Sequence, residues 1–191
     1  MDLSFDSRLN NFLSVLSGME VTTKAHKSLE KESGLREVYT RLESLKHAQG
    51  SLYVIGNGGS AGVASHAVTD FFNVGKIKAF TLHESSLLTC MTNDFGYENA
   101  FAKMLDQLIS DRDVLIAISS SGNSINIRNA VDTATKHHAS VITLSGFSQE
   151  NPLRQMGDIN IWLDSDDYGF VEIGHQFILH NIADRFNPKL V

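Results

Sequence analysis

An α/β fold, with a parallel sheet covered by helices on both faces, is predicted by two hydrophobic patterns that alternate along the chain. Short apolar runs, typical of buried strands, occur at residues 51–55, 79–82, 113–118, 140–144 and 158–163. Apolar residues at helical spacing occur at residues 60–73, 85–92, 98–110, 124–138 and 171–186. Strands that alternate with helices form βαβ units, and the continuous apolar run at 114–118 indicates a strand buried on both faces.

Two amphipathic helices are predicted before the first strand, at residues 3–17 and 28–48, from their apolar spacing. The length of 191 residues is typical of one domain. We therefore expect a single domain over residues 1–191, with an N-terminal helical segment at 1–48 and an α/β core at 49–187.

Composition excludes several classes of partner. The net charge of −6 and the lack of a basic stripe argue against binding to nucleic acid or to an anionic membrane. No apolar run approaches the roughly 18 residues of a membrane span. The single cysteine, Cys90, cannot form an internal disulfide, and the first residues show no signal-peptide pattern, so we expect a cytoplasmic protein.

A glycine-rich loop at residues 56–62 follows the first predicted strand and opens a helix. Glycines let the backbone approach a ligand closely, and free N–H groups at a helix start attract an anion. A tight turn without a ligand is one alternative. A dinucleotide site is another, because Gly56, Gly58 and Ala61 match the G-x-G-x-x-[GA] pattern and Glu84 follows the next strand.

A serine-rich loop at residues 118–124 follows the third predicted strand and opens another helix. Its hydroxyls are Ser119, Ser120, Ser121 and Ser124. A helix cap at Ser124 would need only one of the four. Hydroxyl and N–H donors at a helix start suit the phosphate of a small ligand, and a dinucleotide enzyme has no obvious need for this loop.

The stretch containing Asn93 and Asp94 precedes a glycine, which is typical of a turn but also suits hydrogen bonding to a polyol. His66 and Asp70 are four residues apart and so share one helix face. Together with Glu172, His175 and His180 on the last helix, they could bind a divalent metal or relay protons near neutral pH.

Spacing limits the metal interpretation, because Glu172 and His180 are about 12 Å apart along a continuous helix. Either Glu172 lies in the loop before the helix, or the ligands come from different subunits. The other histidines, His26, His47, His83, His137 and His138, are expected at the surface.

These residues, taken together, resemble the sugar isomerase (SIS) domain family, and within it the bacterial phosphoheptose isomerases. The resemblance extends from about residue 30 to residue 186. It rests on four ordered motifs: Gly56-Asn57-Gly58-Gly59-Ser60 with His66 and Asp70; Asn93-Asp94-Phe95-Gly96; Ser119-Ser120-Ser121-Gly122-Asn123-Ser124; and Glu172 with His175 and His180.

The resemblance implies a three-layer, flavodoxin-like fold with a five-stranded parallel sheet, and a homotetramer with N-terminal helices in the interface and active sites shared between subunits. It implies Zn²⁺, one per subunit, at His66, Asp70, Glu172 and His180. It implies that a phosphorylated seven-carbon sugar is bound by Asn57, Gly58, Gly59, Asp70, Asn93, Asp94, Ser119, Ser120, Ser121, Ser124 and Glu172, with Ser119, Ser121 and Ser124 on the phosphate.

The implied reaction is the conversion of sedoheptulose 7-phosphate to D-glycero-D-manno-heptose 7-phosphate through an enediol, for heptose-containing glycans. His180 is favoured for the carbon-bound proton and Asp70 for the oxygen-bound proton, although the reverse also fits. Asp70 stands where the best-known members have Glu, and Glu172 where they often have Gln. Alternatives are a non-catalytic SIS adaptor for a replication initiator or another protein, and an isomerase for another sugar phosphate.

Overall fold

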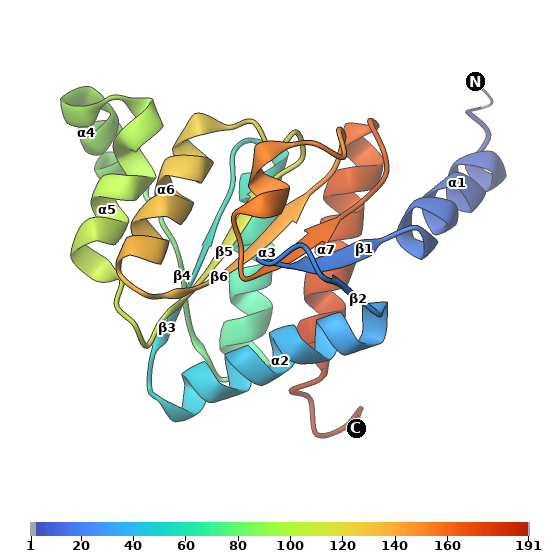
Figure 1. The fold of residues 1–191 in the computed structure, drawn as a ribbon, viewed down its shortest axis with the longest axis horizontal. Coiled ribbons are helices and arrows are strands. Elements are labelled where there is room, and N and C mark those ends of the chain that lie inside the picture. The colour runs from blue at the N-terminus through green and yellow to red at the C-terminus, as the bar shows by residue number, and fades with distance from the viewer. Residues whose placement is uncertain (1–2, 191) are drawn as a thin grey trace.

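A mixed sheet forms the centre of the molecule over residues 3–190, the part of the chain that the computed structural model describes. Its strand order is β2-β1-β7-β6-β5-β3-β4 (Figure 1). The strands are β1 (Glu20–Thr23), β2 (Ser28–Leu29), β3 (Ser51–Ile55), β4 (Lys78–Thr81), β5 (Val114–Ser119), β6 (Ser140–Ser145) and β7 (Ile159–Trp162). Residues 1, 2 and 191 of the predicted 1–191 domain lie outside the described residues.

Helices connect and cover these strands. They are α1 (Phe5–Ser17), α2 (Lys31–His47), α3 (Gly59–Asn73), α4 (Ser85–Phe95), α5 (Ala100–Leu108), α6 (Ile125–Lys136) and α7 (Tyr168–Asp184), with 3₁₀ turns η1 (Tyr97–Asn99) and η2 (Pro152–Gln155). None of the helices in the described part of the chain is long and apolar enough to cross a membrane.

The five strands predicted from sequence form the parallel part of the sheet, β7-β6-β5-β3-β4. The central strand β5 is buried at all six positions, as expected for a strand that has helices on both faces. The α/β prediction is therefore confirmed, with two further strands added to the five that were expected.

The two additional strands, β1 and β2, pair antiparallel with each other, and β1 pairs antiparallel with β7. They lie before α2, so the helix predicted at residues 28–48 begins instead at Lys31, where the Glu30 carboxylate caps it by accepting from the Glu32 and Ser33 N–H groups. Of the residues in β1, only Val21 is buried. A single buried position gives no hydrophobic periodicity, and the β-branched Val-Thr-Thr run was the available signal.

Two hydrophobic clusters lie on opposite faces of the sheet and make three layers. The first packs α2, α3 and α7 against one face, with Leu42, Phe71 and Ile182 fully buried. The second packs α5 and α6 against the other, with Phe101 and Ile127 at its centre. In Figure 1, α5 and α6 lie side by side at one end, while α1 projects at the other and buries no residue of its own.

The strand order reverses its direction of growth between β3 and β5. From β3 the chain first adds β4 on one side and then crosses over to place β5 on the other side. In open parallel sheets, ligands bind at the carboxyl ends of the strands beside such a switch point. The glycine-rich loop follows β3 and the serine-rich loop follows β5, so both lie at this crevice.

Candidate functional site

A cavity of about 230 Å³ lies at the switch point. Its lining comes from the glycine-rich loop, the serine-rich loop and the first turn of α7. The lining residues are Asn57, Gly58, Gly59, Ser60, Ile118, Ser119, Ser120, Ser121, Ser124, Tyr168 and Glu172. The structure thus brings together eight of the residues predicted to bind a ligand.

The start of α3 leaves its N–H groups free of side-chain partners. Gly58, at the N-cap position, has φ of +53° and ψ of −122°, and no side chain caps the helix there. This conformation is accessible to glycine and strained for other residues. Gly56 packs so closely on the Ser60 backbone that a Cβ would overlap it. The loop is therefore built to bring backbone donors to the edge of the cavity.

The serine-rich loop shows the same property at the start of α6. Ser124 occupies the N-cap position, but its hydroxyl makes no capping hydrogen bond and instead accepts from the Ser119 hydroxyl at 3.1 Å. The Ser120 Oγ atom is buried and has no hydrogen-bond partner within the described chain. Two uncapped helix starts and several hydroxyls thus converge on one cavity, an arrangement that attracts an anion.

Glu172 lies at the cavity and not in a loop before the last helix. Helix α7 runs without interruption from Tyr168, so both Glu172 and His180 are helical and about 12 Å apart along it. The Glu172 carboxylate rests against Gly59 at the start of α3, where a Cβ would overlap it. The first explanation offered for the spacing, that Glu172 precedes the helix, is therefore wrong.

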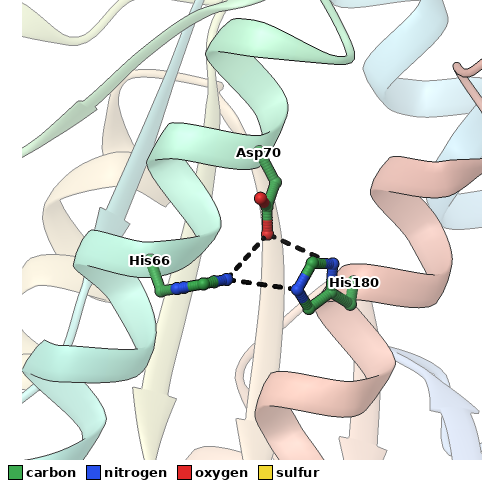
Figure 2. Close-up of side chains that lie close together, drawn as sticks. All are labelled: His66, Asp70 and His180. Carbon is green, nitrogen blue, oxygen red and sulfur yellow. Dashed lines mark hydrogen bonds and ion pairs between the residues drawn. The ribbon is translucent and has the colours of Figure 1, made fainter.

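A second constellation lies between α3 and α7, where His66, Asp70 and His180 meet (Figure 2). Asp70 Oδ2 is 3.4 Å from His66 Nε2 and 3.4 Å from His180 Nδ1. The two imidazoles approach within 3.1 Å at their Nε2 atoms. Both histidine side chains are about half exposed, at 52% and 46%, whereas that of Asp70 is 16% exposed.

These three residues fit a divalent metal. One ligand atom from each lies within 4.8 Å of the others, and imidazole nitrogen with carboxylate oxygen is a donor set that zinc takes. Asp70 Oδ2 is buried and makes no hydrogen bond, and its contacts are the two histidine nitrogens at 3.4 Å, so its lone pairs are open to a shared cation. Glu172, the fourth predicted ligand, stands apart from this group within the chain.

Two other predicted residues lie outside the cavity. Asn93 and Asp94 are exposed in the last turn of α4, where the Asn93 amide donates to the Asp94 carboxylate at 2.9 Å. The acidic residue of the dinucleotide pattern, Glu84, caps α4 by accepting from the N–H groups of Ser86 and Leu87. Its carboxylate is therefore engaged locally, which removes the support that the dinucleotide alternative drew from it.

His83, one of the histidines expected at the surface, is only partly exposed. The ring is partly buried edge-on against Phe101, and its Nε2 accepts from the Gly56 N–H at 3.4 Å. Burial lowers the pKa of His83, which favours the neutral imidazole that can accept this hydrogen bond. His83 follows the second predicted strand, at the edge of the sheet where ligands bind, and this position was the sequence signal that it could contact the glycine-rich loop.

Sequence reasoning also missed three lining residues: Ser60, Ile118 and Tyr168. Tyr168 begins α7, and its ring packs edge-on against that of Phe147. His175, a further candidate for metal binding or proton relay on the last helix, does not join His66 and His180: it is fully buried and bonds the Ser145 carbonyl through Nε2 at 3.1 Å. It belongs to the core and not to the cavity.

Comparison with known proteins gives consistent matches. A family model described as "SIS domain" matches residues 20–146. A phosphoheptose isomerase of Helicobacter pylori (strain ATCC 700392 / 26695) is 34% identical over 173 residues, covering 84% of this chain and 89% of that protein. The solved phosphoheptose isomerase of Francisella tularensis aligns with a TM-score of 0.81 at 25% identity, covering 95% of each chain. That of Neisseria gonorrhoeae aligns at 0.82 and 24% identity, also covering 95% of each chain, and supports the fold.

Proposed function

Because this chain belongs to the SIS domain family and is a sugar-phosphate isomerase of the phosphoheptose type, we propose that it converts sedoheptulose 7-phosphate to D-glycero-D-manno-heptose 7-phosphate. This product supplies the biosynthesis of heptose-containing glycans. The reaction is an aldose–ketose exchange, in which one proton moves between C1 and C2 and another between the two oxygens.

The observation that carries this proposal is the meeting of two uncapped helix starts at the serine-lined cavity. The helix N-termini and the hydroxyls of Ser119, Ser121 and Ser124 would hold the phosphate with neutral donors. This explains how a chain with a net charge of −6 accepts an anionic substrate. Binding energy from the phosphate, remote from the reacting carbons, would orient the other end of the sugar.

The acid–base pair of the proposal is His180 and Asp70. His180 takes the proton from C1 and returns it to C2, because an imidazole nitrogen can both accept and donate a proton. Asp70 carries the proton from O1 to O2, so that the enediol forms and collapses with protons balanced. Their contact at 3.4 Å, between His180 Nδ1 and Asp70 Oδ2, supports a joint role in proton transfer.

His66, Asp70 and His180 are the residues that would hold a zinc ion. Bound zinc would polarise the sugar oxygens and so favour removal of the carbon-bound proton. A lone pair of Asp70 or His180 that binds zinc cannot accept a proton at the same time. Metal binding and proton transfer would therefore compete for these two side chains. A non-catalytic adaptor would have no need for this assembled cluster.

We further propose a homotetramer with sites shared between subunits. The first turns of α3 and α7 carry the cavity, whereas the His–Asp cluster lies about two turns further along both helices. Exposed apolar side chains lie on the same two helices at Phe72 and Phe177 and also along α1. A neighbouring subunit that covers these side chains would close the site. Sedimentation velocity of the purified protein measures the oligomeric state and so tests whether the tetramer forms.

The cytoplasm is the compartment we propose. Cys90 is exposed and forms no disulfide within the described chain, which suits a reducing environment. An exposed thiol of this kind would persist poorly under oxidising conditions.

The test of the proposed function is incubation of the purified protein with sedoheptulose 7-phosphate, with metal analysis of the same preparation. Formation of the heptose 7-phosphate is expected. Thermal-shift measurements with a panel of other sugar phosphates and NAD run in parallel. If the protein converts only a different sugar phosphate, that compound would replace sedoheptulose 7-phosphate as the proposed substrate. Stabilisation by NAD alone would contradict a sugar-phosphate site.

A further inference from the structure

Asn57 is held by a hydrogen-bond network that joins three separate elements. It lies in the glycine-rich loop and lines the cavity. Its amide pairs with that of Asn126 in the first turn of α6, through two reciprocal bonds of 2.9 Å. The Tyr97 hydroxyl, from η1, donates to the same Asn57 Oδ1 at 2.7 Å.

The network uses up the acceptor capacity of Asn57. An amide oxygen has two lone pairs and an amide nitrogen has two hydrogens. Asn57 Oδ1 receives one hydrogen from Tyr97 and one from Asn126, so both lone pairs are occupied. Asn57 Nδ2 gives one hydrogen to Asn126 Oδ1, which leaves its second N–H for a partner outside the network.

Burial makes this arrangement hard to reverse. Asn126 is 3% exposed, so its amide has few other partners available and a lost bond would cost the desolvation of a buried polar group. Reversal of the Asn57 amide alone would set nitrogen against nitrogen and oxygen against oxygen. The Asn57 amide group is therefore held in place by Tyr97 and Asn126, side chains that do not themselves line the cavity.

We propose that Tyr97 and Asn126 are positioning residues that fix Asn57 as a hydrogen-bond donor toward an acceptor oxygen of the sugar phosphate. This inference rests on the proposed function and adds the direction in which Asn57 contacts the substrate. It also gives a role to the segment that contains Asn93 and Asp94. That segment reaches the site through the Tyr97 hydroxyl, although its own amide and carboxylate lie outside the cavity.

The test is a double-mutant cycle read as KM and kcat for sedoheptulose 7-phosphate. Tyr97→Phe removes the hydroxyl, frees one Asn57 lone pair, and is expected to raise KM roughly three- to tenfold, with a smaller change in kcat. In an Asn57→Ala background, Tyr97→Phe is expected to have no further effect, because the hydroxyl acts only through Asn57.

Tyr39→Phe is the matched control. Its hydroxyl also makes one side-chain hydrogen bond, to Glu43 at 2.9 Å on α2, far from the cavity, and its loss should leave both constants unchanged. An unchanged KM in Tyr97→Phe, or an equal rise in KM with and without Asn57, would overturn this inference while leaving the proposed function intact. A folded wild-type protein without turnover would overturn both.

Discussion

At the scale of single residues, Asp70 is the side chain on which most of the chemistry depends. Asp70→Asn keeps the size of the side chain but removes its charge and basicity. We expect turnover to fall by roughly 10²–10⁴-fold, the usual contribution of a positioned acid or base. The melting temperature should change little, because the amide fills the same space and still places a polar atom beside His66 and His180.

The control for this substitution is Asp106→Asn. Asp106 also pairs with a histidine, His137, at 2.9 Å, but on the α5–α6 side of the molecule. Its loss should leave turnover at the wild-type level. Equal activity of Asp70→Asn and Asp106→Asn in a steady-state assay would remove Asp70 from the mechanism.

A substitution at Gly59 tests whether the Glu172 carboxylate acts at the cavity. In Gly59→Ala the new methyl group would overlap the Glu172 carboxylate, a flexible group that must then swing away from the cavity. We expect a clear loss of kcat/KM with little loss of stability. Gly62→Ala, on the same helix with open space around it, should keep full activity and gain about 0.5–1 kcal/mol of unfolding free energy. Full activity in Gly59→Ala would place Glu172 outside the site.

Residue types were predictable from the sequence, but side-chain partners were not. The serine and glycine loops could be located because each follows an apolar run and opens a helix. Glu84 and Asn93 had equally suitable chemistry, yet the first caps α4 and the second lies outside the cavity. The partner of a polar side chain depends on which N–H groups lie near it in the folded protein, and the spacing of residues in the sequence does not reveal this.

At the scale of elements, the start of α6 separates a structural role from a ligand-binding role for Ser124. A capping serine that is replaced by alanine costs about 0.5–2 kcal/mol of stability. Because the Ser124 hydroxyl makes no capping bond, Ser124→Ala should cost much less than this and should instead raise KM for the sugar phosphate. Chemical denaturation and steady-state kinetics on the same variant measure both. A large loss of stability with an unchanged KM would show that Ser124 acts as a helix cap and not as a ligand-binding residue.

Long elements with strong periodicity were predictable, and short ones were not. All five parallel strands were found from apolar runs. Burial on both faces leaves few polar positions in β5, β6 and β7, whereas the edge strand β4 is only partly buried. Strands β1 and β2 have four and two residues and depend on pairing with β7 for their existence. Tertiary pairing of this kind leaves almost no trace in local hydrophobicity.

At the scale of the whole molecule, the buried His175 makes stability depend on pH. Burial lowers the pKa of His175 to about 4, whereas a free histidine titrates near 6.5. Between these values the unfolded chain takes up a proton that the folded chain does not. The unfolding free energy should therefore fall as the pH drops from about 6.5 to about 4, by about 3 kcal/mol from this group.

His175→Gln is the variant that isolates this contribution, because its amide retains an N–H donor for the Ser145 carbonyl without a titrating group. Urea unfolding of both proteins at fixed protein concentration, across this pH range, gives the difference. A wild-type curve that runs parallel to that of His175→Gln would show that burial of this imidazole carries no pH-dependent cost.

The molecule combines an anion cavity at the switch point with an acid–base cluster between α3 and α7, and we propose that it isomerises its substrate through an enediol. The most direct measurement is NMR of sedoheptulose 7-phosphate incubated with the protein in deuterium oxide. We predict an aldose 7-phosphate that carries deuterium at C2, because the proton passes through an exchanging side chain. A folded, metal-loaded protein that yields no aldose phosphate, or yields it with only the original hydrogen at C2, would contradict the claim.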